Sequence, residues 1–235
     1  MSANTVLANA KDVDSYAVSH LIAIDKALTD TISNTAKNGA PPIAVSPTQG
    51  KFLSLLTRIS GAQNVLEIGT LGGYSSIWFA RSLKAGGKKG KVTSVEVLED
   101  RRELAMQNLR NAGVKVPEEA EVLLGAGLEV LPRLLAEIEQ GKRPKFDFIF
   151  IDADWENQWN YFDYGVKLSK GPGSVILIDN AVQKMLEDGI AGQGKRREDA
   201  ISVVEKVGQD RRVEAVLLQT LGAKQHDGFL MALLV

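Results

Sequence analysis

The 235-residue chain contains no cysteine, which excludes disulfide bonds, thiolate metal ligands and a cysteine nucleophile. Its formal net charge of −1 gives no global positive field of the kind that nucleic-acid-binding proteins need. No apolar stretch is long enough to span a bilayer, and the N-terminus lacks a positively charged segment followed by an apolar one. We therefore expect a cytoplasmic protein that binds neither nucleic acid nor membrane.

Short apolar runs alternate with segments of helical periodicity along most of the chain. This alternation predicts an α/β fold with a Rossmann-like, doubly wound, mostly parallel sheet. Seven strands are expected, at residues 64–68, 91–97, 121–124, 146–151, 174–178, 213–219 and 228–234. The last two are joined by a short loop, so one of them is expected to run antiparallel at the edge.

Helices are expected between these strands and ahead of the first one. Helical periodicity extends over residues 14–37, and Ser46 followed by Pro47 is typical of an N-cap and a first helical residue. Another helix is expected over residues 198–207. No repeat or linker interrupts the chain, so we expect one domain over residues 1–235, with an N-terminal helical segment (1–60) and a Rossmann-like core (61–235).

Oxygen-bearing side chains follow two of the buried apolar runs. One run ends at Asp152 and Asp154, and the next ends at Asp179 and Asn180. Such oxygens suit Mg²⁺ or Ca²⁺ rather than softer metals. Each residue alone could equally be a helix cap or a turn residue. Their recurrence at two strand ends predicts one divalent-cation site.

A glycine turn at residues 69–73 follows the first expected strand, and Glu96 ends the second. An acid at that position can accept hydrogen bonds from ribose hydroxyls, whereas the turn alone is equally explained by packing. The glycine spacing differs from G-x-G-x-x-G, so a ligand without a pyrophosphate fits better.

In their order along the chain, these motifs resemble the cation-dependent O-methyltransferase family, which includes catechol and caffeoyl-coenzyme A O-methyltransferases. The segment at residues 49–56 is also similar to that family. The resemblance implies an S-adenosylmethionine-dependent enzyme that methylates a hydroxyl of a catechol-like or phenolic small molecule. A NAD(P)-dependent oxidoreductase, and a cofactor-binding protein without turnover, are the two alternatives to this methyltransferase function. The cofactor residues implied by it are Val45, Glu67, Gly69, Leu71, Ser75, Glu96, Gly125, Ala126 and Asp152.

The resemblance also assigns the metal ligands and reveals one departure. Asp152, Asp179 and Asn180 would hold the divalent cation, with Mg²⁺ expected first and Mn²⁺ or Ca²⁺ as alternatives. Where the family carries a lysine regarded as the general base, this chain has Trp155. Asp154, Glu156 or Lys184 could replace that base, or the cation alone could ionise a phenol. The catalytic candidates are Asp152, Asp154 and Lys184, and Trp155 is expected to form a wall for the substrate ring. Homodimers are usual in the family, so a homodimer is expected here.

Overall fold

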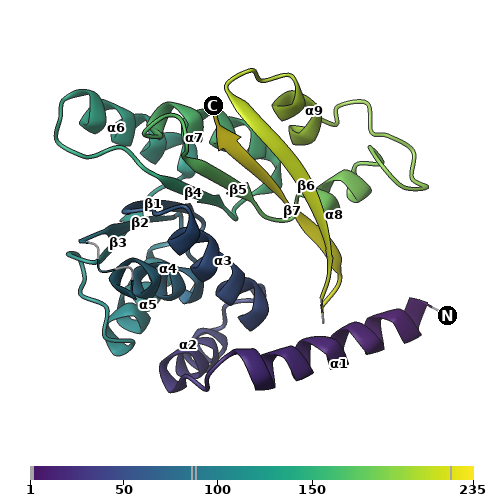
Figure 1. Cartoon of the computed structure of the whole chain (residues 1–235), viewed down its shortest axis with the longest axis horizontal. Coiled ribbons are helices and arrows are strands. Elements are labelled where there is room, and N and C mark those ends of the chain that lie inside the picture. Colours follow the sequence, from purple (N-terminus) through teal and green to yellow (C-terminus); the bar gives the residue numbers. More distant parts are fainter. Residues whose placement is uncertain (1–2, 86, 88, 223) are drawn as a thin grey trace.

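The structure is a computed structural model that describes residues 3–85, 87, 89–222 and 224–235 (Figure 1). Within this part of the chain, one sheet has the strand order β3-β2-β1-β4-β5-β7-β6. The strands are β1 (Asn64–Ile68), β2 (Lys91–Glu96), β3 (Ala120–Leu124), β4 (Phe148–Ile151), β5 (Val175–Ile178), β6 (Val213–Leu221) and β7 (His226–Leu234). The predicted seven-stranded, doubly wound sheet is therefore confirmed.

The five strands β1 to β5 are parallel to one another, and β7 runs antiparallel to both of its neighbours, β5 and β6. The antiparallel strand was expected at the edge. It lies one position further in, because the hairpin returns β7 into the space between β5 and β6. Strand β6 therefore forms the edge of the sheet (Figure 1).

Helices cover both faces of this sheet. They are α1 (Ala3–Leu21), α2 (Lys26–Lys37), α3 (Pro47–Ile59), α4 (Tyr74–Ala85), α5 (Glu99–Asn111), α6 (Gly127–Glu139), the 3₁₀-helix η1 (Trp155–Asn157), α7 (Gln158–Leu168), α8 (Ala181–Glu187) and α9 (Val203–Gly208). Helices α3, α4 and α5 lie on one face, and α6, α7 and α9 lie on the other (Figure 1). None of the helices in the described ranges is long and apolar enough to cross a membrane.

Three helix predictions are corrected by the structure. The single helix expected over residues 14–37 is two helices, because Asp25 adopts an extended backbone and caps α2 by accepting a hydrogen bond from Leu28 N at 3.1 Å. The helix expected from residue 198 begins at Val203, because Ser202 caps it. Residues 181–187 form helix α8, whereas the sequence predicted only the helix at 198–207 between β5 and β6.

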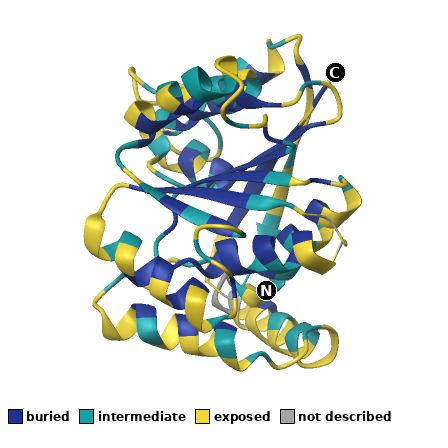
Figure 2. Cartoon of the chain, turned by 90° about the vertical axis from the view of Figure 1, so that its left-hand side faces the viewer, coloured by how far each residue is buried: buried dark blue, intermediate teal, exposed yellow. Residues whose placement is uncertain are grey.

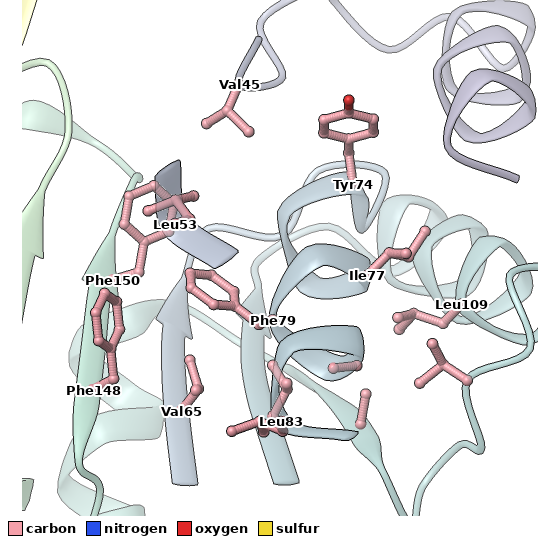
Figure 3. Packing of buried hydrophobic residues seen from close by; sticks show 14 of the residues in the cluster. Val45, Leu53, Val65, Tyr74, Ile77, Phe79, Leu83, Leu109, Phe148 and Phe150 are labelled. Carbon is pink, nitrogen blue, oxygen red and sulfur yellow. The ribbon is translucent and has the colours of Figure 1, made fainter. Parts of the chain in front are cut away.

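Two separate cores lie above and below the sheet because successive side chains of a strand point to opposite faces. Phe148 and Phe150 pack toward α3 and α4, beside Phe79 (Figure 3). Ile149 and Ile151 belong to the other core, with residues of α6 and α7. Figure 2 shows the buried sheet enclosed between helices whose outer surfaces are exposed. The strands are thus fixed from both sides, and their ends can hold side chains in defined positions.

Candidate active site

The predicted site residues meet along one edge of the sheet, at the carboxyl ends of the parallel strands. Backbone pairing extends one residue beyond the strands, with Asp152 N donating to Ile68 O and Asp179 N donating to Ile151 O, both at 2.9 Å. Along this edge the residues follow one another in the order Gly125, Glu96, Gly69, Asp152 and Asp179. The strand order reverses between β1 and β4, which is the place where open α/β sheets bind ligands.

The glycine turn after β1 is shaped mainly by contacts within the protein. Gly69 has a φ of +97°, and a Cβ there would lie 1.9 Å from the carbonyl oxygen of Asp152. A Cβ on Gly72 would lie 2.0 Å from Thr35 Oγ1 on α2. The space beside these two glycines is therefore filled by protein. This supports packing, which was one of the two explanations left open for the turn.

Glu96 ties the glycine turn to the end of β2. Its Oε2 accepts a hydrogen bond from Leu71 N at 2.9 Å, and its Oε1 accepts one from Leu98 N at 3.1 Å. Glu96 is buried, and Leu71 has a positive φ of 51°. Because each carboxylate oxygen can accept two hydrogen bonds, capacity remains for the hydroxyls of a ligand.

Glu67 lies fully buried on β1 at the centre of the sheet. Its Oε2 accepts hydrogen bonds from Ser76 and, at 2.5 Å, from Ser94. Burial raises the pKa of Glu67 in spite of the serine hydroxyls around it. Across the described residues its Oε1 has no hydrogen-bond partner, and a donor on a bound ligand would satisfy such an atom.

The other predicted cofactor residues lie where helices begin. Val45 is buried just ahead of α3, and Ser75 is buried in the first turn of α4. Ala126 caps α6, and Gly125 before it has a φ of +140°. Helices α4 and α6 follow β1 and β3, so their N-termini lie at the carboxyl edge of the sheet, which suits polar groups of a nucleoside-type ligand.

Acidic residues are concentrated at the ends of β4 and β5. Burial and the charge of Asp227 raise the pKa of Asp179 to about 7. Burial, Asp179, Glu67 and Asp227 together raise the pKa of Asp152 well above its usual value. Repulsion between carboxylates held this way is relieved by a proton or by a bound cation.

The donor set at these two strand ends fits a hard divalent cation. Throughout the described ranges, no three His, Cys, Asp or Glu side chains group closely enough to hold a metal. The predicted set instead combines the carboxylates of Asp152 and Asp179 with the carboxamide of Asn180. Three protein oxygens suit Mg²⁺, which keeps several waters or substrate oxygens among its six ligands.

Asn180 has its carboxamide held on both sides. Its Nδ2 donates to Asp227 Oδ2 at 2.7 Å, and its Oδ1 accepts from Trp155 Nε1 at 3.3 Å. Sequence reasoning missed Asp227, which is buried on β7. In the sequence, Asp227 is marked only by the glycine that follows it. The structure explains that glycine, because a Cβ on Gly228 would lie 2.2 Å from Leu218 O.

The two further catalytic candidates have partners of their own. Asp154 is exposed, and its carboxylate accepts hydrogen bonds from Tyr161 and Asn157. Lys184 is buried on α8, with its Nζ 3.1 Å from Asp188 Oδ1 and 3.6 Å from Glu156 Oε1. The structure therefore places the Lys184 ammonium in an ion-pair cluster with Asp188 and Glu156.

Lys224, which was not predicted, is a cation whose charge acts on the metal-ligand candidates. Burial raises the pKa of Asp152 and Asp179, whereas Lys224 lowers it. The Lys224 Nζ donates to the carbonyl oxygens of Ala44, at 2.7 Å, and Pro42, at 3.2 Å. The β6–β7 hairpin is thereby tied to the segment that carries Val45.

Comparison with known proteins identifies the family. The family model described as O-methyltransferase matches residues 19–233. The chain is 41% identical over 231 residues to the O-methyltransferase imqG of Aspergillus flavus, covering 94% of this chain and 89% of that protein. It is 37% identical over 228 residues to a catechol O-methyltransferase of Niastella koreensis, covering 95% and 96%.

Solved structures agree with this result. The O-methyltransferase from Bacillus cereus in complex with SAH superimposes with a TM-score of 0.85 at 39% identity, covering 97% of this chain and 100% of that one. The fold and the motifs thus define an S-adenosylmethionine-dependent methyltransferase. The chain belongs to the O-methyltransferase family. Membership of this family favours methyl transfer over the NAD(P)-dependent alternative.

Proposed function

We propose that this enzyme methylates a hydroxyl of a catechol-like or phenolic small molecule and needs a divalent cation to do so. The observation that carries the proposal is that Asp152 and Asp179 lie at neighbouring strand ends beside the glycine turn. Burial raises the pKa of both carboxyls, and the charge of Asp179 raises the pKa of Asp152 further. A cation that neutralises them would at the same time be held next to the donor pocket. A named relative supports the substrate class, since the Niastella koreensis protein is a catechol O-methyltransferase.

The donor pocket is assigned to the sheet edge between β3 and β4. Glu96 would bind the ribose, and the turn held by Glu96 through Leu71 would border the methionine part. Residues Gly125 and Ala126 would border the adenine. Bound S-adenosylmethionine supplies the methyl group as a sulfonium. The remaining predicted cofactor residues, Val45, Glu67, Gly69, Ser75 and Asp152, would border the same pocket.

The acceptor side is assigned to Asp152, Asp179, Asn180 and Trp155. A bound cation, Mg²⁺ or alternatively Mn²⁺ or Ca²⁺, would lower the pKa of a coordinated hydroxyl and orient it. Two adjacent hydroxyls on one ring can chelate such an ion, which favours a catechol over a monophenol. Trp155 is half-buried beside Asn180 and is assigned as the wall against the substrate ring.

No separate general base is required by this proposal. Of the three catalytic candidates, Asp152 is assigned to the cation. The carboxylate of Asp154 is bonded to Tyr161, and the ammonium of Lys184 is bonded to Asp188. A bound cation would lower the pKa of the coordinated hydroxyl, so that its proton could pass to water without a separate base. The cytoplasmic location and the homodimer expected from the sequence stay predictions.

Methyl transfer from labelled S-adenosylmethionine tests the proposal. The purified protein is assayed on catechol and on phenol, with Mg²⁺ and with a chelator. We expect methylated catechol only when metal is present, and loss of that activity in Asp179→Ala. Asp30→Asn, which changes an exposed acid on α2, is the control and should retain full activity. Chelator-resistant turnover, or full activity of Asp179→Ala, would contradict the metal assignment.

A further inference from the structure

The orientation of the Asn180 carboxamide is set by two partners that agree. A carboxylate accepts hydrogen bonds and donates none, so the group facing Asp227 at 2.7 Å must be the Asn180 nitrogen. An indole N–H is a donor only, so the group facing Trp155 must be the Asn180 oxygen. A carboxamide can adopt two orientations that differ by exchange of its oxygen and nitrogen. Each contact by itself selects the orientation with Nδ2 toward Asp227 and Oδ1 toward Trp155.

Asp227 is itself rigidly held. Its Oδ1 accepts hydrogen bonds from Gly228 N at 2.8 Å and from Gln183 N, in the first turn of α8, at 3.0 Å. Its Oδ2 accepts from Asn180 and, at 3.3 Å, from Gln225 Nε2. The carboxylate is buried, so it cannot turn away from Asn180 without leaving backbone N–H groups unpaired.

We propose that Asp227 is a positioning residue that turns the Asn180 oxygen, rather than the nitrogen, toward the divalent cation. The inference rests on the proposed function. The oxygen and nitrogen ends of a carboxamide are nearly equal in size, so shape alone does not select the liganding atom. A flipped amide would present N–H groups to the cation and remove one of its three protein ligands.

This role also gives a reason for Trp155 in this chain. Asn180 adopts a left-handed backbone with a φ of 56°, and its side chain has no cap hydrogen bond to α8. Its orientation therefore depends on the two side-chain contacts. Trp155 contributes a donor on one side of the carboxamide, and Asp227 contributes the matching acceptor on the other.

Direct metal binding tests the proposal without any turnover. The Mn²⁺ affinity of the full-length protein is measured by titration calorimetry, and also by electron paramagnetic resonance, in which the signal of free Mn²⁺ decreases on binding. Asp227→Asn should weaken Mn²⁺ binding by about tenfold to 100-fold, the usual effect of removing a group that orients a metal ligand. Glu187→Gln removes the same charge from an exposed residue of α8 and should leave the affinity unchanged.

A reciprocal exchange restores the orienting contact while keeping the total charge of the wild-type site. In the double variant Asn180→Asp with Asp227→Asn, the donor and acceptor trade places, so one oxygen at position 180 again faces the cation. We expect this variant to bind Mn²⁺ at least fivefold more tightly than Asp227→Asn alone. Melting temperature and SAH affinity of each variant are measured alongside, because the pocket for SAH is assigned mainly to other strand ends.

The outcomes distinguish the two proposals. If the wild-type protein binds no Mn²⁺, the metal part of the proposed function is wrong, and this inference fails with it. If the wild type binds Mn²⁺ and Asp227→Asn binds it equally well, only the positioning role is wrong. The positioning role is also overturned if the double variant binds no better than Asp227→Asn, or if Glu187→Gln loses as much affinity.

Discussion

The Nζ of Lys224 lies 2.7 Å from the carbonyl oxygen of Ala44, and this contact joins the β6–β7 hairpin to the segment before α3. Val45, the next residue along the chain, is buried at the predicted cofactor pocket. Because the side chain also donates to Pro42 O, it holds two successive parts of that segment. The hairpin thus helps to fix the segment that carries a predicted cofactor residue.

Replacing Lys224 should lower the affinity for SAH more than it lowers the melting temperature. Lys224→Met should weaken SAH binding about threefold to tenfold, since a hydrogen bond contributes about 0.5 to 1.5 kcal/mol. Lys224→Arg keeps a donor and should lose less. Calorimetric titration with SAH measures the affinity, and a melting curve serves as the control for folding. Equal affinities for Lys224→Met and the wild type would contradict a role for this contact.

Gly69 should tolerate no side chain, because two effects coincide at that position. Gly69→Ala would place a Cβ 1.9 Å from Asp152 O in a backbone with a φ of +97°. Gly39→Ala is the matched control, since Gly39 has a φ of +75° with open space around it. We expect Gly39→Ala to cost about 1 to 2 kcal/mol and Gly69→Ala about 3 kcal/mol or more in free energy of unfolding. Urea denaturation measures both, and similar losses would argue against the close approach of β1 and β4.

The parts of this fold that sequence predicts are those set by local patterns. The apolar runs before Asp152 and Asp179 were predicted as strands, and the structure confirms them as β4 and β5. Each run is apolar over a few positions and is followed directly by an acid, so its end is visible in the sequence. Ser46 caps α3 as expected, with Pro47 in the first turn. The short helix α8 was missed, since seven residues carry too little periodicity to reveal a helix.

The parts that sequence did not reveal depend on contacts between distant residues. Asp227 and Asn180 are 47 positions apart, and Lys224 and Ala44 are 180 apart. Apart from the glycine that follows Asp227, no local pattern distinguishes these two hairpin residues from ordinary surface charges. Lys184 shows the converse, because its proximity to Asn180 in sequence suggested a catalytic role, whereas its ammonium pairs with Asp188. Side-chain partners therefore had to come from the structure.

Glu96 should govern cofactor binding more than the chemical step. Glu96→Ala removes the acceptor of Leu71 N as well as the predicted partner of the ribose. Hydrogen bonds to a charged group contribute about 1.5 to 3 kcal/mol, so SAH affinity should fall roughly tenfold to 100-fold. Glu103→Ala, on the exposed face of α5, should leave it unchanged. A large fall in kcat at saturating S-adenosylmethionine, with the affinity retained, would refute this assignment.

Without metal, the stability of the protein should fall as the pH rises through neutrality. Burial raises the pKa of Asp179 from 3.8 to about 7 in the folded state, so between these values the folded protein binds more protons than the unfolded chain. This contribution is fully present below pH about 4 and is lost as the pH passes 7. In a chelator, the melting temperature of the wild type should therefore drop from pH 5 to pH 8.

Two comparisons isolate the carboxyl responsible for this pH dependence. Asp179→Asn cannot ionise, so its melting temperature should fall less between pH 5 and pH 8. Adding Mg²⁺ should raise the wild-type melting temperature more at pH 8 than at pH 5, because the cation binds the ionised carboxylates and competes with protons. Scanning fluorimetry at both pH values measures all three effects. If the melting temperatures of the wild type and Asp179→Asn change equally with pH, another group is responsible for the titration. If the stabilisation by Mg²⁺ is the same at both pH values, the cation does not bind these carboxylates.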